Sequence, residues 1–424
     1  MTSEDSDILK LKSDNKHTPI FDNPSLDGCG EAGGYDLSIR KGRHRCQPLQ
    51  FKKDLLGMSL AELQQLCAEE GMPKFAAKQI CDWLYAKHVD SIEAMTNLSL
   101  RARARLSEIA YIGRTAPVSC QVSKDGTKKY LFEIENLQLK MENKHTPVFD
   151  HPSKEGTLPH QDNSQFPILN SQFPKCVEAV LIPDDDRATL CISCQIGCKM
   201  GCRFCVTGQQ GFHGNLSASD ILNQIFSIPE SATLTNVVFM GMGEPMDNLD
   251  SVLRVTEVLT APWGLGWSPK RITVSSVGII PALRRFLDES QCHLAISLHN
   301  PFADERLSIM PMQKAYPIAD IISLLRQYDW SGQRRISFEY TMLRDINDTP
   351  RHAAELVRML KGLYCRVNLI HFHSSPNTPY RTSTSQSIAT FQNHLNAHGI
   401  TCTLRASRGE DIMAACGLLA GQKR

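Results

Sequence analysis

The sequence lacks a long apolar run, an excess of charge of either sign and an apolar leader. It has no stretch of about 18 uncharged apolar residues, which excludes a membrane-spanning helix. Lys and Arg number 46 and Asp and Glu 45, so the formal net charge of +1 indicates no polyanionic partner, and any contact with nucleic acid must come from local basic patches. Residues 1–10 have neither the basic nor the apolar region of a secretory signal, so we expect a cytoplasmic protein.

Cysteine, in contrast, is abundant: the chain has fifteen. Disulfides are rare in a reducing compartment, so metal binding or catalysis should account for some of these residues. Cys67, Cys81, Cys292 and Cys365 lie in apolar or helical stretches, where a thiol is expected to act as a small buried hydrophobe. Candidates for chemistry must come from the other cysteines.

The chain is predicted to have four regions. Residues 1–50 are rich in Gly, Asp, Ser and Pro and are expected to be a disordered tail. Residues 51–137 have the apolar spacing of helices and are predicted to form a small helical accessory domain with a short strand pair. Residues 138–175 are predicted to be a low-complexity loop insertion, in which 143–153 nearly repeats a segment of the tail. Residues 176–424 would form the catalytic domain.

The accessory domain carries basic residues, which form either a solvated face or a surface that binds RNA. The run Arg40–Arg45 in the tail and the insertion loops would add to such a surface. The basic residues of the helical region are Lys74, Lys78, Arg101, Arg103 and Arg105.

From residue 176 onward, short apolar strands alternate with helical stretches such as 218–228 and 318–328. Strands joined by crossover helices form a parallel sheet, and six such strands are two short of a closed eight-stranded barrel. The predicted fold class is therefore α/β, an open (βα)6 partial TIM-type barrel with a small N-terminal helical accessory domain. The predicted strands are 188–193, 236–240, 271–275, 293–298, 336–342 and 366–372.

The strongest chemical signal is the loop Cys198-x3-Cys202-x2-Cys205, directly after the first of these strands. Thiolates bind iron–sulfur clusters, and three of them hold three irons of a cubane while the fourth iron stays open to a ligand. Zinc is the alternative, but no further Cys or His stands at zinc-ribbon or zinc-finger spacing. Cys194 is a further thiol nearby and is expected to be a bystander.

With aromatic Phe204 before its last cysteine, this loop resembles that of the radical S-adenosylmethionine (SAM) superfamily. In that superfamily the methionine moiety of SAM chelates the open iron, and one-electron reduction releases a 5′-deoxyadenosyl radical. Further motifs resemble the RlmN family of dual-specificity RNA methyltransferases, in the same order, over roughly residues 51–137 and 176–420. These motifs are Arg187–Cys191, Thr207–Gly211, Gly241–Pro245, Arg271–Ser276, Ser297–His299, Arg408–Ile412 and Ala414–Gly417.

The resemblance implies methylation of adenine C2 in 23S rRNA, at the peptidyl-transferase centre, and in tRNA, at the adenosine 3′ of the anticodon. It implies one [4Fe–4S] cluster on the three loop cysteines and two molecules of SAM per turnover. At position 373 the family has Asn where this chain has His, so a contact there would use the backbone carbonyl. The implied SAM contacts are Gly243, Glu244, Ser275, Ser297, Leu298, His299 and His373.

The resemblance also assigns two catalytic thiols. Cys416 would be methylated by one SAM, lose a hydrogen atom to the radical from a second SAM, and add its methylene carbon to adenine C2. Cys191 would then resolve the thioether by forming a disulfide with Cys416. Glu178 matches the family's proton acceptor, although without the resemblance it would be interpreted as a surface charge on a strand. Either Glu178 or Cys191 could take the C2 proton.

Three alternatives stay open on the sequence. Methylation at adenine C8, as in the related resistance enzymes, uses the same two cysteines. A non-catalytic iron–sulfur or zinc RNA-binding protein would bind RNA without cleaving SAM. A methylthiotransferase would need a second set of cluster cysteines, which the sequence lacks. An electron donor such as flavodoxin or ferredoxin is expected as a partner, and a monomer is the expected state.

Overall fold

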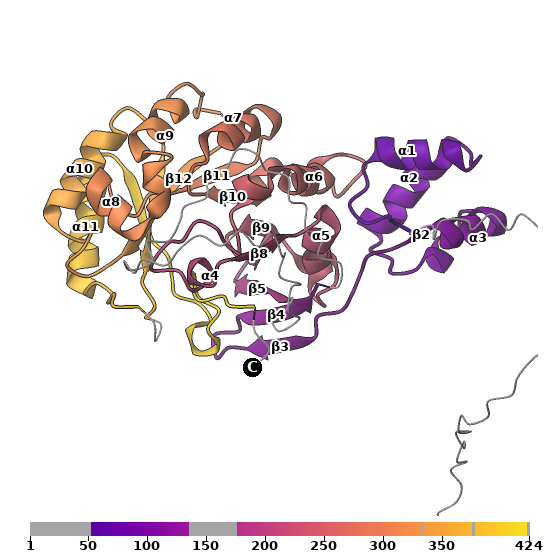
Figure 1. The fold of residues 1–424 in the computed structure, drawn as a ribbon, viewed down its shortest axis with the longest axis horizontal. Helices are drawn as coiled ribbons and strands as arrows, with labels where there is room; N and C mark the ends of the chain where they lie inside the picture. Colours follow the sequence, from indigo (N-terminus) through magenta and orange to yellow (C-terminus); the bar gives the residue numbers. More distant parts are fainter. Residues whose placement is uncertain (1–51, 135–175, 333, 375–377, 422–424) are drawn as a thin grey trace, which may run out of the picture. The chain divides into compact units, whose positions relative to one another are not determined.

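The computed structural model describes residues 52–134, 176–332, 334–374 and 378–421, which all belong to one unit of the chain, Gln50–Arg424 (Figure 1). The predictions for the tail, for Arg40–Arg45 and for the insertion with its near-repeat lie outside these residues. Within them, no helix is both long enough and apolar enough to cross a membrane.

The N-terminal region is helical, and its helices begin where the sequence supplies caps. Helix α1 starts after Ser59, whose hydroxyl accepts the amide of Glu62 while the Glu62 carboxylate accepts the amide of Ser59. A short π-helix, Asp82–Ala86, continues α2. The short strands β1 and β2 pair in parallel. The elements of this region are β1 Lys53–Asp54, α1 Leu60–Glu69, α2 Ala76–Cys81, α3 Leu100–Ile109 and β2 Ala110–Tyr111.

The large sheet has the order β14-β13-β12-β11-β10-β9-β6-β5-β4-β3, and every pair from β6 to β14 is parallel. Each of the six predicted strands is present, so the predicted partial barrel is confirmed. The sequence analysis missed β5 and β14. The strands are β3 Ser119–Val122, β4 Lys128–Glu133, β5 Cys176–Asp184, β6 Arg187–Cys191, β9 Asn236–Phe239, β10 Ile272–Ser276, β11 His293–Ser297, β12 Ile336–Met342, β13 Arg366–His371 and β14 Thr401–Leu404.

The strands β3 and β4 form the predicted hairpin, with its turn at Asp125-Gly126. Gly126 has a φ of 84°, and the amide of Ser123 bonds to the carbonyl of Thr127 at 2.8 Å. The sequence analysis placed this hairpin in the accessory domain, but β4 pairs antiparallel with β5 and so extends the sheet of the barrel. β4 is buried on both faces, since consecutive residues from Lys129 to Phe132 are buried, as expected for a strand inside the sheet.

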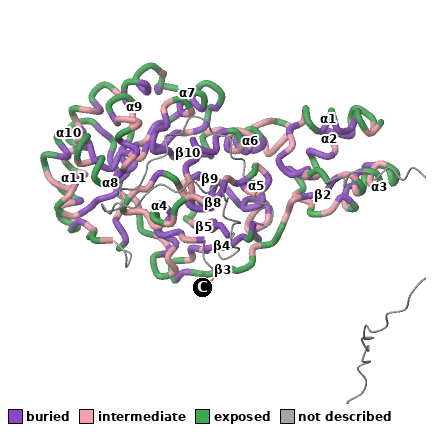
Figure 2. Tube along the Cα trace, viewed as in Figure 1, coloured by how far each residue is buried: buried purple, intermediate pink, exposed green. Residues whose placement is uncertain are grey.

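Helices cover the outer side of the parallel strands (Figure 1). They are amphipathic: α10 buries Ala353, Leu356 and Leu360 and leaves Ala354 and Arg358 exposed. Figure 2 shows the same division, with buried strands and helices that alternate between buried and exposed residues. The helices are α4 Val206–Gln209, α5 Ala218–Phe226, α6 Leu249–Thr260, α7 Ile280–Glu289, α8 Ala303–Ile309, α9 Ile318–Leu325, α10 Pro350–Leu360 and α11 Ser385–Ala397.

The carboxyl ends of parallel strands lie at the same edge of the sheet. In (βα) barrels the functional residues lie at this edge. The loops that follow β6, β9, β11 and β13, and the end of β10, carry residues that were singled out from the sequence. A separate small sheet, β7 Gln195–Gly197 with β8 Phe212–Asn215, lies between β6 and α5 in the chain and frames the cysteine loop.

Candidate functional site

The cysteine loop runs from β7 to α4 and is shaped by close backbone contacts. Gly197 has a φ of 72°, and a Cβ atom there would lie 1.9 Å from the carbonyl oxygen of Gly211, so only glycine fits. The amide of Cys198 bonds to the same carbonyl at 2.8 Å. The chain therefore leaves β7 in a fixed direction and places three cysteines within eight residues, Cys198–Cys205.

The three thiols of this loop are chemically suited to a cluster. Burial raises the pKa of each, and for Cys202 the nearby Cys205 adds to burial and raises the pKa to about 12. For Cys205, amide and hydroxyl donors from Thr207 and Gly208 act in the opposite direction. Buried thiolates repel one another and need a cationic partner such as iron. The hydrogen bonds to Cys205 are of the kind that adjust the reduction potential of iron–sulfur clusters.

No three His, Cys, Asp or Glu side chains among the described residues converge on one metal-ion position. In a cubane cluster each thiolate binds a different iron, so the three sulfur atoms do not have to converge on one point. The donor set of Cys198, Cys202 and Cys205 thus fits a [4Fe–4S] cluster.

The turn Gly241–Pro245 follows β9 and brings Glu244 inward. Gly243 has a φ of 102°, and a Cβ atom there would lie 2.6 Å from the Cβ of Gln195. The carboxylate of Glu244 accepts the amides of Met246 at 3.0 Å and Val277 at 2.9 Å, so it links the ends of β9 and β10. Burial raises the pKa of Glu244 to about 7. A buried carboxylate at this position can accept an ammonium group.

His299 lies just beyond β11 in a strained conformation, with a φ of 54°. Its Nδ1 accepts the amide of Thr341 at 3.0 Å, so in the neutral ring the proton must be on Nε2. Burial and the charge of Arg306 lower the pKa of His299 to about 3, so the ring is neutral at physiological pH. The ring of Phe204 in the cysteine loop lies 4.9 Å from that of His299, centroid to centroid. Ser297–His299 and the cysteine loop therefore meet.

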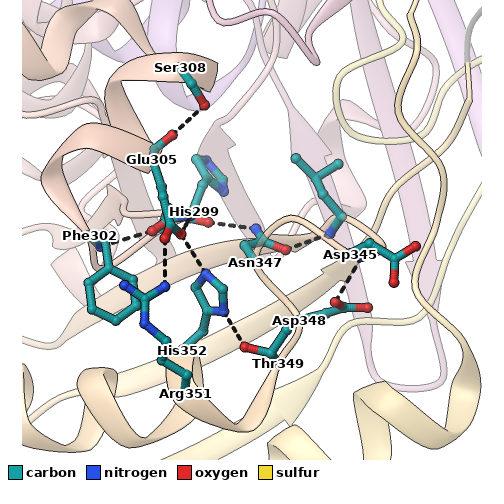
Figure 3. Close-up of polar contacts among 12 residues, drawn as sticks. His299, Phe302, Glu305, Ser308, Asp345, Asn347, Asp348, Thr349, Arg351 and His352 are labelled. Carbon is teal, nitrogen blue, oxygen red and sulfur yellow. Dashed lines mark hydrogen bonds and ion pairs between the residues drawn. The ribbon is translucent and has the colours of Figure 1, made fainter.

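A polar network behind His299 holds this strand end in place (Figure 3). The amide of Asn347 donates to the carbonyl of His299 at 2.6 Å and to that of Thr341 at 2.7 Å. Close by, Glu305 accepts from Arg351 at 2.6 Å and from His352 at 2.7 Å. The sequence analysis predicted none of these supporting residues.

The remaining predicted SAM contacts are distributed along the same strand ends. Ser275 is in β10, opposite Ala295 of β11, and Leu298 is fully buried directly after β11. His373 is buried beyond β13, where its Nδ1 lies 3.3 Å from a carboxylate oxygen of Glu410. The side chain of His373 thus contacts the C-terminal segment.

Cys191 and Cys416 come together in the fold. Cys191 is the last residue of β6 and is buried. Its pKa is raised to about 12, first by burial and then by the nearby Cys416. The Cys416 residue is exposed overall, although its neighbours crowd the thiol, and both thiols are free. The positive charge of Arg405 lowers the pKa of both cysteines and so opposes the rise in pKa that burial causes.

The segment that carries Cys416 is bonded to α4, the helix that follows the last loop cysteine. The amide of Val206 donates to the carbonyl of Gly417 at 2.8 Å. The hydroxyl of Thr207 donates to the carbonyl of Leu419 at 2.7 Å. These bonds place Cys416 beside the cysteine loop as well as beside Cys191.

Glu178 holds the end of the same segment. One carboxylate oxygen accepts the amides of Ala420 at 2.7 Å and Gly421 at 3.1 Å, and the other lies 3.1 Å from the ammonium of Lys129. The side chains of Lys129 and Glu178 are only 8% and 5% exposed. Glu178 is therefore a buried anchor rather than a surface charge, and its carboxylate already has three donors.

Arg405 and Glu339 form a further charged pair that was not predicted from the sequence, in which Glu339 is buried and the side chain of Arg405 is 40% exposed. Arg405 Nε lies 3.3 Å from one carboxylate oxygen of Glu339, whose other oxygen accepts from Ser337 at 2.9 Å and Asn368 at 2.7 Å. The signal for it was present, since Ser337, Glu339 and Asn368 are polar residues inside otherwise apolar strands. Such residues point to a polar interior only once the strands are known to be adjacent.

Two regions of the chain match known families. Residues 53–112 match the ribosomal RNA large subunit methyltransferase N-terminal domain, and residues 192–357 match the radical SAM superfamily.

Several relatives align over most of the chain. A protein of Phocaeicola vulgatus named probable dual-specificity RNA methyltransferase RlmN is 51% identical over 373 residues, which cover 88% of this chain and 96% of that protein. A dual-specificity RNA methyltransferase RlmN of Syntrophotalea carbinolica is 36% identical over 370 residues, or 87% of this chain and 90% of that one. The crystal structure of a radical SAM methyltransferase from Sphaerobacter thermophilus aligns with a TM-score of 0.74 and 35% identity, over 87% of this chain and 100% of that one.

Proposed function

Because the chain belongs to the RlmN family of radical SAM RNA methyltransferases, we propose that it methylates C2 of an adenosine in 23S rRNA and of the adenosine 3′ of the anticodon in tRNA. The resemblance that the motifs indicated is thereby confirmed at the level of the family. The observation that carries the proposal is the meeting of Cys191 and Cys416 beside the cysteine loop.

Cys198, Cys202 and Cys205 would hold the [4Fe–4S] cluster, and an electron donor such as flavodoxin or ferredoxin would reduce it. With SAM bound, the cluster supplies one-electron cleavage of the cofactor. Glu244 would bind the ammonium of SAM, supported by its buried carboxylate. The fixed Nε2–H of His299 would offer a neutral donor on the same side of the barrel. Gly243, Ser275, Ser297, Leu298 and the backbone of His373 would complete the pocket.

Cys416 would act as the carrier of the methyl group. Its sulfur attacks the methyl carbon of a first SAM, so a sulfur–carbon bond forms while the sulfonium bond breaks and S-adenosylhomocysteine leaves. The methyl group on Cys416 would then lose one hydrogen atom to the radical derived from a second SAM, and its carbon would bond to C2 of the adenine, which must be unstacked to reach it. The C2 proton would leave to Cys191 or Glu178. Cys191 would then attack the sulfur of Cys416, so that the disulfide forms while the bond from that sulfur to the RNA-bound carbon breaks. The released carbon would take up a proton to become the methyl group, and the unpaired electron would return to the redox centre that supplied it. Proximity of the two thiols supports this step.

The role of Glu178 as proton acceptor stays a prediction. Its contacts with Ala420, Gly421 and Lys129 support a different primary role, which is to anchor the segment that carries Cys416. An anchored carboxylate can still accept a proton, but it would have to give up one of its donors to do so. We therefore assign the proton transfer to Cys191 or Glu178 and the anchoring to Glu178.

RNA would be bound in part by the helical accessory region. Arg103 and Arg105 are engaged within it, Arg103 with the carbonyl of Glu93 and Arg105 with two carboxylates. Lys74, Lys78 and Arg101 are exposed and support a phosphate-binding surface.

The test is anaerobic reconstitution with iron and sulfide, followed by incubation with SAM, a reductant and RNA from a strain that lacks the protein. Nucleoside mass spectrometry against synthetic standards should find 2-methyladenosine in 23S rRNA and in tRNA. The Cys416→Ala variant should give none, and Cys365→Ala, which changes a half-buried cysteine outside the site, should retain activity. If 8-methyladenosine forms instead, the C2 assignment is wrong, and if no methylated base forms, the proposed function is wrong.

A further inference from the structure

Arg306 is a fully buried arginine whose partners are uncharged. It lies on α8 and is 0% exposed. Its guanidinium donates to the carbonyl of Leu298 at 3.0 Å, to the carbonyl of Ser297 at 2.9 Å and to the side-chain oxygen of Gln313 at 2.7 Å. Among the described residues, these hydrogen bonds include no carboxylate.

A buried cation without an anion is costly, because neutral dipoles replace only part of its hydration. Burial accordingly lowers the pKa of Arg306 to about 10, which still leaves the side chain charged at physiological pH. Cys202 opposes this shift and raises the pKa of Arg306, so a thiolate at that position, as in a bound cluster, would interact favourably with the guanidinium. The fold thus retains a positive charge in its interior, next to a loop cysteine.

The cysteine loop packs on the end of the same helix. The amide of Arg203 donates to the carbonyl of Ile309, the last residue of α8, at 3.0 Å. A Cβ atom on Gly201 would lie 3.8 Å from the ring of Pro311. The residues that Arg306 binds, Ser297 and Leu298, precede the ring of His299, which meets Phe204 of the loop. The guanidinium therefore lies against the end of β11, and the helix that carries it contacts the cysteine loop at its last residue.

We propose that Arg306 is the internal counter-charge of the iron–sulfur cluster and raises its reduction potential. The inference rests on the proposed function, since it requires a cluster on the three loop cysteines. Three thiolates give a ligated cubane a net negative charge, and reduction adds one more electron. A fixed buried cation stabilises the reduced form more than the oxidised form, so electron transfer from a donor becomes easier.

The alternative is that Arg306 only holds the ends of strands through its hydrogen bonds. Two substitutions separate charge from hydrogen bonding. Arg306→Gln keeps an amide donor and removes the charge, whereas Arg306→Lys keeps the charge and loses the planar donor array. Arg334→Gln is the matched control, because Arg334 is also a buried arginine that binds a carbonyl, that of Leu287, and its charge acts on Cys292 and not on a loop cysteine.

The experiment is a redox titration of the reconstituted full-length proteins, without SAM or RNA, monitored by the electron paramagnetic resonance signal of the reduced cluster. We expect Arg306→Gln to lower the equilibrium constant for reduction of the cluster at least tenfold. For one electron, this lowers the midpoint potential by at least 59 mV. Arg306→Lys should shift it by less than half as much, and Arg334→Gln should match the wild type. A loaded Arg306→Gln cluster with the wild-type midpoint would overturn the proposal.

Iron content gives a second measurement if the glutamine variant does not hold its cluster. Loss of iron from Arg306→Gln with retention by Arg306→Lys supports a role of charge. Equal loss from both variants means that the hydrogen bonds matter, and the proposal is then wrong. Failure of the wild type to bind a cubane cluster would refute the proposed function itself, which is a different outcome from an unshifted midpoint.

Discussion

The anchor between Glu178 and the C-terminal segment should be essential for holding Cys416 in place. Glu178 accepts two amides of the segment and pairs with Lys129, and both side chains are buried. Lys129→Met leaves the buried carboxylate without its cation. Glu178→Gln leaves the buried ammonium without its anion and weakens the bonds to Ala420 and Gly421. Either change should release the segment from the barrel.

Removing one partner of a buried ion pair costs about 3–5 kcal/mol, because the other charge stays buried and unpaired. If the whole of this free energy is lost from the docking of the segment, the ratio of docked to undocked protein falls by at least about a hundredfold. The conversion is about 1.4 kcal/mol for each factor of ten. The double variant Lys129→Met/Glu178→Gln leaves no unpaired charge, so its cost should be lower than the sum of the two single costs by about 1–3 kcal/mol.

Hydrogen–deuterium exchange of the peptide that covers residues 414–421 measures this docking directly. Each single variant should exchange at least about a hundredfold faster there, or at the rate of unprotected amides, while α5 keeps its wild-type protection. Lys53→Met is the matched control, because the pair of Lys53 with Glu69 is exposed, at 52% and 46%, and such pairs contribute about 0–1 kcal/mol. Wild-type protection in both single variants would refute the anchor.

The same variants distinguish an anchor from a proton acceptor. If Glu178 only takes a proton, Glu178→Gln lowers RNA methylation while the segment stays protected, and Lys129→Met is active. If Glu178 anchors the segment, both variants lose protection and activity together. Methylation by Lys129→Met at the wild-type rate would show that the ion pair is not needed for catalysis.

Three further predictions concern the thiols and the buried histidine. Cys202→Ala should lose cluster loading, measured as iron and sulfide per chain, while Cys194→Ala should load fully; a fully loaded cubane in Cys202→Ala would be inconsistent with the ligand set. Cys191→Ala should accumulate a covalent adduct between RNA and Cys416, visible on a denaturing gel, whereas Cys292→Ala should turn over; clean turnover by Cys191→Ala would exclude the resolving role. Because the pKa of His299 falls to about 3 on folding from a usual value of 6.5, its contribution to stability is complete above pH 6.5 and is lost as the pH falls from 6.5 toward 3. Chemical denaturation should show that the wild type loses about 2 kcal/mol more than His299→Asn between pH 7 and pH 5, and equal losses would contradict the buried neutral ring.

The sequence was sufficient for the parallel part of the sheet, because each of its strands is a short apolar run between helices. Ile336–Met342 was predicted with the observed limits. Two strands of the large sheet were not predicted, for identifiable reasons. β5, Cys176–Asp184, begins at the end of the insertion and runs into Pro183, which favours a loop prediction. β14, Thr401–Leu404, is a short strand at the sheet edge with mostly exposed residues, so it lacks the apolar pattern.

The candidate site was predictable where its parts are local in the sequence. The spacing of Cys198, Cys202 and Cys205 carries its own chemistry, and the loop around them is built from near neighbours. Contacts between distant segments could not be derived from spacing. The bond from Glu178 to Ala420 uses a backbone amide, which leaves no trace in the residue types. The position of Arg306 depends on α8 folding against β11, so its charge became meaningful only in the fold.

The proposed reaction depends most on the role of Cys416 as the carrier of the transferred carbon. The direct measurement is mass spectrometry of the peptide that contains Cys416, taken from reconstituted protein incubated with SAM and reductant before and after RNA is added. We expect one added methyl group on Cys416 before RNA is present and its loss as methylated adenine appears. An active enzyme whose Cys416 is never methylated would contradict it.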